Sequence, residues 1–270
     1  MPVKVRVLGC SGGIGGGTVR TTSFLVGADT LIDAGTGVGE LELEPLRRID
    51  HVFVTHSHLD HILGIPLIVD AVGGLRDRPL TVHALPATID ALRRHCFNWT
   101  IWPDFTVIPS VAEPGLRFAP MVPGDTVVVG EGVRITALPA VHVVPAMGYQ
   151  VDAGTGSLVF TGDTAPNPAL WPIINRIPDL RHLIIECAFS EADRVLAQLS
   201  CHLCPSLLAV ELAHLTVPDR SLSGPHAVPG LQIHVTHLKP GDSESTMAQI
   251  AGFAPGLTLA RLREGVVFEL

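Results

Sequence analysis

Four side chains of metal-binding types stand close together in the segment Thr55–His61. The segment reads Thr-His-Ser-His-Leu-Asp-His and follows the apolar residues 52–54, which predicts a loop after a buried strand. Neutral imidazole suits zinc, whereas carboxylate suits harder ions such as manganese or magnesium. Four ligands are too many for one tetrahedral ion that keeps a position open for water. The segment therefore predicts a loop that serves two metal ions, and the alternative is a polar loop that happens to be rich in histidine.

Further residues of the same chemical types follow other apolar runs that we expect to be strands. In chain order they are His142 after residues 135–141, Asp163 after 158–161, Glu186 at the end of 183–186, and His237 after 232–236. Each of them alone could equally be a surface or capping residue. Strand ends on one rim of a sheet can converge on a single site, so the repeated placement predicts that these residues meet the first segment in space.

Taken in order, these residues resemble the metallo-β-lactamase superfamily of binuclear hydrolases. The resemblance extends from the glycine-rich residues 9–17 and the turn at Asp33 to His237, which is nearly the whole chain. Three details are similar to the class II 3′,5′-cyclic-nucleotide phosphodiesterases. These are Leu59 in the first segment, residues 98–105 (Asn-Trp-Thr-Ile-Trp-Pro-Asp-Phe) and residues 236–240 (Thr-His-Leu-Lys-Pro). Pro66 departs from the pattern, because it interrupts a stretch that is expected to be continuously apolar.

The resemblance implies a site for two divalent metal ions. Zinc is expected first, and manganese or iron are the alternatives, since sites of mixed nitrogen and oxygen ligands accept them as well. The implied ligands are His56, His58 and His142 for one ion and Asp60, His61 and His237 for the other, with Asp163 bridging the two. Such a pair of ions can generate a bridging hydroxide and clamp the attacked phosphoryl oxygen.

Other residues are expected to support this chemistry. Asp33 is either a turn carboxylate that bonds its own backbone or, as the resemblance implies, a residue that orients a metal-binding histidine. The resemblance also implies that His202 protonates the leaving oxygen as a general acid and that the carboxylate of Glu186 holds it. The alternative for His202 is a helix-capping or surface residue. We expect catalysis to depend on Asp60, His202 and Glu186.

Two aromatic residues are candidate substrate contacts. Tyr149, the only tyrosine in the chain, follows the His142 loop and could face the same pocket. Trp102 lies in residues 97–124, an insert rich in proline and aromatic residues that could form a lid or a dimer contact. The alternative for this insert is a satellite core packed under a proline-rich loop.

Three other patterns are assigned no chemistry. Cys201 and Cys204 form one CxxC without a second pair, so we interpret them as ordinary buried cysteines. The glycine-rich residues 9–17 resemble a dinucleotide-binding loop, but such a loop needs a helix directly after it, and residues 18–26 look like a strand. We expect this loop to flank the mouth of the active site. The remaining histidines show no ligand-like context; they are His51, His83, His95, His182, His214, His226 and His234.

The elements that must position these residues are strands in the first part of the chain and helices between later strands. The expected strands cover residues 3–8, 23–26, 30–32, 51–55, 80–84, 126–129, 133–139, 147–151, 157–161, 183–186 and 232–236, with a strand pair in the last residues. The expected helices cover about 39–48, 60–72, 86–96, 191–200, 205–215 and 243–251, and residues 97–124 are expected to be irregular. The resemblance implies an α/β (α+β) fold, a four-layer αββα sandwich of two mixed sheets flanked by helices. We expect residues 1–270 to form one domain.

Composition narrows the classes of function. Hydrophobic residues make up 47% of the chain and charged residues 16%, which allows a substantial core. The net charge of −8 argues against extended binding to nucleic acid, which needs a basic surface. The N-terminal residues alternate like a strand and unlike a signal peptide, and no run approaches the ~18 apolar residues of a membrane span. Five scattered cysteines do not suggest a disulfide framework, so we expect a cytoplasmic protein.

The leading hypothesis is a binuclear metal-dependent phosphodiesterase that hydrolyses 3′,5′-cyclic nucleotides, cAMP or cGMP. A tRNA 3′-end endonuclease is the first alternative, but it would need a basic surface to dock tRNA. Another esterase or sulfatase of the same fold is the next, and a non-catalytic metal-binding protein is the last. The expected partner is a small phosphodiester substrate, without extended nucleic acid or membrane, and a homodimer is expected from the resemblance alone.

Overall fold

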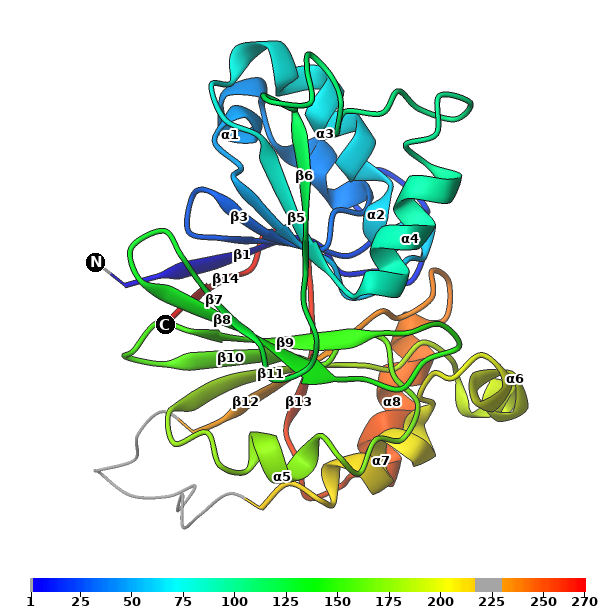
Figure 1. The fold of residues 1–270 in the computed structure, drawn as a ribbon. Coiled ribbons are helices and arrows are strands. Elements are labelled where there is room, and N and C mark those ends of the chain that lie inside the picture. The colour runs from blue at the N-terminus through cyan, green and yellow to red at the C-terminus, as the bar shows by residue number, and fades with distance from the viewer. Residues whose placement is uncertain (1, 217–229) are drawn as a thin grey trace.

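The computed structural model describes residues 2–216 and 230–270, and their strands form two mixed seven-stranded sheets (Figure 1). The first sheet has the order β14-β1-β2-β3-β4-β5-β6. Its strands are β1 (Lys4–Gly9), β2 (Ser23–Val26), β3 (Thr30–Ile32), β4 (His51–Phe53), β5 (Leu80–Ala84), β6 (Leu116–Pro120) and β14 (Val267–Glu269). Strands β14 to β3 pair antiparallel, and β3 to β6 pair parallel.

The second sheet repeats this plan with the order β13-β12-β11-β10-β9-β8-β7. Its strands are β7 (Thr126–Val129), β8 (Val133–Pro139), β9 (Met147–Asp152), β10 (Ser157–Phe160), β11 (Leu180–Glu186), β12 (Gln232–Thr236) and β13 (Leu259–Arg261). Strands β7 to β10 pair antiparallel, and β10 to β13 pair parallel. The C-terminal ends of β8, β10, β11 and β12 therefore all lie at the same end of this sheet.

Helices cover the outer face of each sheet, which completes four layers (Figure 1). The first sheet carries the 3₁₀ helices Thr36–Glu40 and Gly73–Leu75 with α1 (Leu43–Arg47), α2 (Leu59–Ile62), α3 (Gly64–Val72) and α4 (Pro86–His95). The second carries α5 (Trp171–Ile174), the 3₁₀ helix Glu191–Asp193, α6 (Arg194–Leu199), α7 (Pro205–Leu212) and α8 (Ser243–Phe253). The predicted αββα sandwich is confirmed.

Three hydrophobic clusters hold these layers together. The inner cluster lies between the sheets, where Phe24 of the first sheet meets Phe160 of the second edge to face, with ring centroids 4.9 Å apart. A second cluster joins the first sheet to α3 and α4. A third joins the second sheet to α5, α7 and α8. Burial on both faces explains why the central strands are continuous apolar runs.

Several element boundaries differ from the expectation. The helix expected at 60–72 is divided between α2 and α3, because Pro66 lacks the N–H that would bond the carbonyl of Ile62. The segment 97–124 is not irregular throughout, since β6 lies within it and pairs parallel with β5. The last residues do not form a strand pair. β13 joins the second sheet and β14 joins the first, so the C-terminal segment crosses from one sheet to the other.

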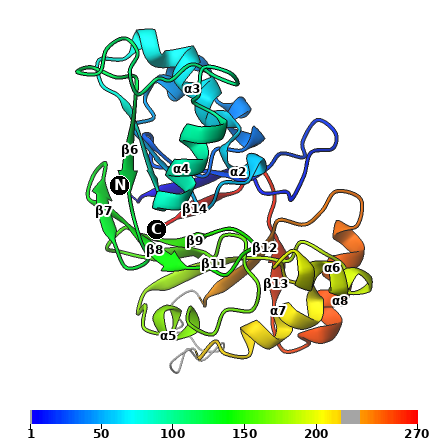
Figure 2. The ribbon, with the colours of Figure 1, turned by 45° about the vertical axis from the view of Figure 1, so that its right-hand side comes forward.

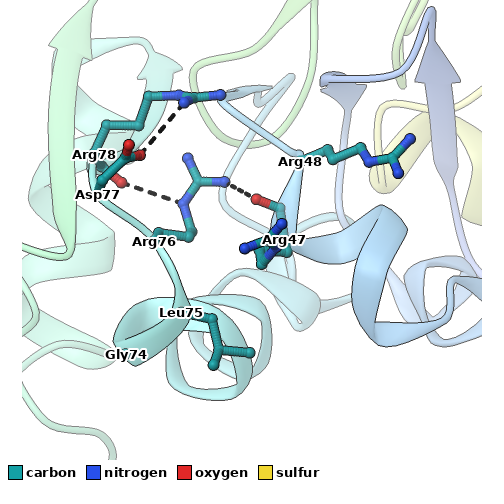
Figure 3. A pocket seen from close by; sticks show the side chains of 7 residues that line it. All are labelled: Arg47, Arg48, Gly74, Leu75, Arg76, Asp77 and Arg78. Atoms are coloured by element: carbon teal, nitrogen blue, oxygen red, sulfur yellow. Dashed lines mark hydrogen bonds and ion pairs between the residues drawn. The ribbon is translucent and has the colours of Figure 1, made fainter.

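A group of arginines surrounds Asp50 at the N-terminal end of β4, the opposite end from the His56 loop. Arg78 donates to both carboxylate oxygens of Asp50 at 2.8 Å, and buried Arg76 donates to the same group at 2.7 Å. Arg76 also donates to the carbonyl oxygens of Arg47 and Arg78 (Figure 3). These bonds engage all three guanidinium nitrogens of Arg76, so we interpret the group as a structural tie between the chain before β4 and the chain before β5.

Of the helices in the described parts of the chain, none combines the length and the apolar character that crossing a bilayer requires.

Candidate metal centre and active site

The candidate ligands lie at one end of the sandwich, where strands of both sheets end. The His56 loop follows β4 in the first sheet and leads into α2. His142, Asp163 and His237 follow β8, β10 and β12 in the second sheet. Both ribbon views place α2 and α6 at this same end of the two sheets (Figure 2). The predicted convergence of strand ends therefore brings these residues into one site.

One group of three imidazoles is formed by His56, His58 and His142. Nδ1 of His58 lies 3.0 Å from Nε2 of His56 and 3.2 Å from Nε2 of His142. All three ligand atoms lie within 4.8 Å of one another, which is close enough for one ion to contact them together. This is the group that was expected to hold the first ion.

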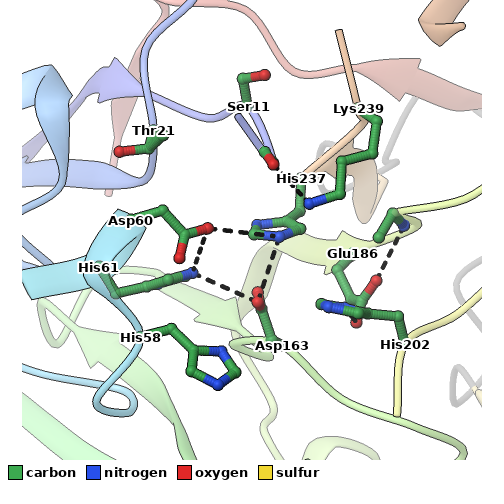
Figure 4. Close-up of polar contacts among 12 residues, drawn as sticks. Ser11, Thr21, His58, Asp60, His61, Asp163, Glu186, His202, His237 and Lys239 are labelled. Atoms are coloured by element: carbon green, nitrogen blue, oxygen red, sulfur yellow. Dashed lines mark hydrogen bonds and ion pairs between the residues drawn. The ribbon is translucent and has the colours of Figure 1, made fainter. Parts of the chain in front are cut away.

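A second group combines Asp60, His61 and His237 (Figure 4). Oδ2 of Asp60 lies 3.6 Å from Nε2 of His61 and 3.8 Å from Nε2 of His237. The imidazoles are almost fully buried, whereas Asp60 is partly exposed at the mouth of the site. This is the group that was expected to hold the second ion.

Asp163 lies between the two groups. Its Oδ2 is 3.4 Å from Nε2 of His61 and 3.3 Å from Nε2 of His237 in one group, and 3.8 Å from Nε2 of His56 in the other. Burial would raise the pKa of Asp163, but the neighbouring imidazoles of His237 and His61 hold it well below its usual range. Asp163 therefore favours the ionised form and lies in the position expected for a bridging ligand.

The outer hydrogen bonds of three histidines turn their free lone pairs toward the centre. His61 donates from Nδ1 to Oδ2 of Asp33 at 2.6 Å, and His142 donates from Nδ1 to the carbonyl oxygen of Cys201 at 3.0 Å. The hydroxyl of Thr55 donates to Asp33 at 2.9 Å, so it accepts from Nδ1 of His56 at 3.0 Å. In the neutral form of each imidazole, Nε2 then carries the lone pair that can bind a metal. Burial would lower the pKa of His61, but Asp163 and Asp33 raise it well above its ordinary value, so a metal at its Nε2 must displace a proton.

Two further observations show that a metal pair fits these residues. Nε2 of His61 and Oδ1 of Asp163 are buried and have no hydrogen-bond partner among the described residues. Burial lowers the pKa values of His56, His58 and His142, which keeps the imidazoles in the neutral form that metals require. Five histidines and two aspartates gathered in this way suit two divalent cations.

Asp33 is fully buried, and its position matches the role expected for it. It accepts hydrogen bonds from the amide and hydroxyl of Thr55 at 2.8 and 2.9 Å as well as from His61. Its backbone adopts a left-handed conformation with φ 55°, which aspartate and asparagine tolerate better than most residues. The carboxylate thereby orients His61 directly, and His56 through Thr55.

We predict that Asp33→Asn weakens metal binding by about 10- to 100-fold, as the loss of such outer hydrogen bonds does elsewhere. Asparagine keeps the shape and the backbone conformation but removes the charge that fixes the proton on Nδ1 of His61. Competition with a zinc chelator measures the affinity, and Asp77→Asn at a highly exposed position serves as the control. Equal affinities for the two variants would refute this role of Asp33.

Glu186 and His202 form a hydrogen-bonded pair beside the two groups (Figure 4). Oε1 of Glu186 lies 2.7 Å from Nδ1 of His202, and its carboxylate also accepts from the amides of Thr164, Ala188 and Leu203. Burial would lower the pKa of His202, but the neighbouring carboxylate of Glu186 raises it above its ordinary value. A ligand nitrogen of His202 also lies within 4.8 Å of the ligand atoms of His142 and Asp163. An imidazole that is hydrogen-bonded to a buried carboxylate is thus held beside the two groups.

Of the two expected substrate contacts, the structure contradicts Tyr149 and does not test Trp102. The expectation for Tyr149 is wrong: its side chain is fully buried in the inner cluster, and its hydroxyl donates to the carbonyl oxygen of Val54 at 2.8 Å. Trp102 is half-buried and packs against the second cluster, which joins the first sheet to α3 and α4. This agrees with the alternative that residues 97–124 form a satellite core. A substrate contact of Trp102 stays a prediction.

Two residues of the site were not identified from the sequence. Thr55 links Asp33 to His56, and its place directly before the first histidine was the available signal. The carbonyl of Cys201 orients His142, and no side-chain pattern could reveal it because every residue has a carbonyl. Cys201 and Cys204 are both free; Cys204 is buried, as expected, whereas Cys201 is only partly buried. His226, expected to be structural or solvated, lies outside the described residues.

Comparison with known proteins agrees with this geometry. The beta-lactamase superfamily domain, a sequence family, matches residues 29–259. A probable 3′,5′-cyclic-nucleotide phosphodiesterase of Yersinia pestis is 27% identical over an alignment of 280 residues, which covers 88% of this chain and 78% of that protein. Ribonuclease Z of Halorubrum lacusprofundi is 32% identical over 159 residues, which covers 56% of this chain but only 48% of that protein.

Solved structures also share the fold. The crystal structure of unliganded yeast PDE1 aligns over 100% of both chains with a TM-score of 0.81 and 20% identity. An αββα sandwich with paired histidine and aspartate groups at its strand ends defines a metallo-β-lactamase-type protein. This chain belongs to the beta-lactamase superfamily, because the family matches most of its length.

Proposed function

We propose that this protein is a binuclear metal-dependent hydrolase that cleaves a phosphodiester bond in a small molecule, a 3′,5′-cyclic nucleotide. The observation that carries the proposal is the position of the Asp163 carboxylate between two ligand groups, with His202 held beside them by Glu186. The relative in Yersinia pestis is named as a probable phosphodiesterase of this kind, and it aligns with 88% of the chain.

The chain's own residues divide the work between binding and proton transfer. Two divalent ions, when bound, would supply an activated water at neutral pH and offset the charge that develops on the phosphoryl oxygens. His56, His58 and His142 would hold one ion, and Asp60, His61 and His237 the other, with Asp163 shared. The histidine-rich set favours zinc, with manganese or iron as alternatives.

Proton transfer to the leaving group falls to His202. Its Nδ1 is engaged by Glu186, so Nε2 is the atom that can donate to the departing oxygen. Opening a cyclic nucleotide expels an alkoxide, which leaves slowly without a proton. A general acid at this position is worth roughly 10²- to 10⁴-fold in rate.

A tRNA 3′-end nuclease is the second candidate, because ribonuclease Z of Halorubrum lacusprofundi is 32% identical to part of this chain. The net charge of −8 disfavours it, since docking of tRNA requires a basic surface. We also expect a cytoplasmic location and a homodimer. The five cysteines are all free, which accords with a reducing compartment.

A panel of substrates on metal-quantified protein tests the proposal. We expect two ions per chain, turnover of cAMP or cGMP and of a bis-aryl phosphate, and no cleavage of a β-lactam. Removal of metal by a chelator should abolish turnover, and zinc should restore it. Cleavage of a precursor tRNA without turnover of cyclic nucleotides would favour the second candidate. Two bound ions with no turnover of any phosphodiester would overturn both.

A further inference from the structure

His237 is held differently from the other buried histidines of the site. Its inner Nε2 faces Asp163 and Asp60, but its outer Nδ1 is buried and has no hydrogen-bond partner among residues 2–216 and 230–270. The buried His56 and His61 and the partly buried His142 each have such a partner. The backbone of His237 is also left-handed, with φ 59°, which residues other than glycine rarely adopt. The orientation of this imidazole must therefore come from packing.

The glycine-rich first loop packs directly against His237. A Cβ atom added to Gly12 would lie 2.4 Å from the carbonyl oxygen of His237, 2.8 Å from its Cδ2 and 3.1 Å from its Nε2. Contacts this short are not tolerated, so only glycine lets the loop approach this closely. On other sides, the rings of His202 and His61 stack on His237 at centroid distances of 5.3 and 5.5 Å.

Lys239 fastens this loop in place (Figure 4). Its ammonium group donates to the carbonyl oxygen of Gly12 at 2.6 Å and lies 5.8 Å from the centre of the Phe189 ring. The amide of Gly12 donates to the carbonyl oxygen of Leu238 at 3.2 Å, and the amide of His237 donates to that of Cys10 at 2.9 Å. The loop and the end of β12 thus form one interlocked unit around the imidazole.

We propose that Gly12 and Lys239 are positioning residues for His237. They hold its ring by close packing, whereas the rings of the other buried histidine ligands are held by hydrogen bonds. The inference rests on the proposed two-metal site, and it predicts an effect on the binding of only one of the two ions. The ion of Asp60, His61 and His237 should depend on Gly12 and Lys239, whereas the ion of His56, His58 and His142 should not.

The first test compares Gly12→Ala with Gly17→Ala. Gly17 lies in the same loop, but a Cβ there would meet nothing within 4 Å and its φ is not in the left-handed range, so it is a matched control. Titration of metal-free protein with Co²⁺ should show two binding steps by calorimetry and by the absorption of the bound ion. We expect Gly12→Ala to weaken one step by about 10- to 100-fold, like other losses of support around a ligand. Gly17→Ala should leave both steps unchanged.

The second test replaces the lysine. Lys239→Met keeps a long side chain against Phe189 but removes the bond to Gly12, and Lys239→Arg restores a donor. We expect Lys239→Met to weaken the same step as Gly12→Ala and Lys239→Arg to recover most of it. Turnover by Lys239→Met should rise toward that of the unsubstituted chain as metal concentration is raised. This variant decides the question if Gly12→Ala does not fold.

Folded variants that bind both ions as tightly as the unsubstituted chain would overturn the inference. Equal weakening of both steps would also overturn it, since that result indicates a general structural role. The proposed function fails separately. The proposed function is wrong if the unsubstituted chain hydrolyses no phosphodiester. That outcome can be seen even if Gly12→Ala weakens one metal-binding step as expected.

Discussion

Replacing Asp163 with asparagine is expected to lower kcat for cyclic nucleotides by about 10³- to 10⁴-fold, since the stabilisation that a metal pair supplies amounts to several kcal/mol. Asp163 is the one carboxylate within 4 Å of Nε2 atoms from both ligand groups in the described chain. Asparagine keeps the volume but removes the negative charge that two cations would share. Both ions should bind more weakly as a result.

Steady-state kinetics at saturating zinc, with metal content measured on the same samples, checks this expectation. Asp77→Asn is the matched control, because it makes the same chemical change at a side chain that is 90% exposed. Activity of Asp163→Asn within a few-fold of the unsubstituted chain would show that this carboxylate does not bridge two catalytic ions.

His202→Ala is expected to have the second largest effect, and that effect should depend on the leaving group. Hydrolysis of a cyclic nucleotide should slow by about 10²- to 10⁴-fold, since its alkoxide needs a proton. Hydrolysis of an activated aryl phosphodiester should slow much less, because a nitrophenolate leaves without one. Equal slowing of both substrates would refute general-acid catalysis.

The pH dependence gives a second measurement on the same residue. Glu186 raises the pKa of His202, so the protonated acid is present below that raised pKa and is lost as pH rises through it. The rate on cyclic nucleotides should therefore have an alkaline limb that His202→Ala lacks. Glu186→Gln removes the charge that raises the pKa, so the limb should move to lower pH. Two ions should remain bound in His202→Ala, and loss of one would identify His202 as a ligand instead.

The gathering of the candidate ligands was predictable because each uses its side chain and follows an apolar strand. The spacing of His56, His58, Asp60 and His61 marked one loop, and strand ends marked the rest. Support for the ligands was harder to predict where it comes from backbone atoms. The carbonyl of Cys201 and the close approach of Gly12 have no side-chain signature, and only the folded chain brings them to His142 and His237.

The errors in the fold have similar physical causes. Tyr149 was placed near the substrate because it follows the His142 loop, but side chains of a strand alternate between faces. Its face of β9 points into the inner cluster, where its hydroxyl reaches the Val54 carbonyl. The terminal strands β13 and β14 are three residues each, too short for their sequence to specify a partner. Long-range contacts assign them to different sheets.

Each ligand group combines residues from both sheets, and this has a mechanical consequence. Each ligand group takes two residues from the loop after β4 or from α2 beside the first sheet, and one from a strand end in the second, His142 or His237. Sliding one sheet over the other would therefore open both groups at once. The packing of Phe24 on Phe160 and of Phe53 on Tyr149 sets the register of the sheets. The packing of the inner cluster thus sets the distances between ligand atoms of the two sheets, although the cluster itself does not contact those atoms.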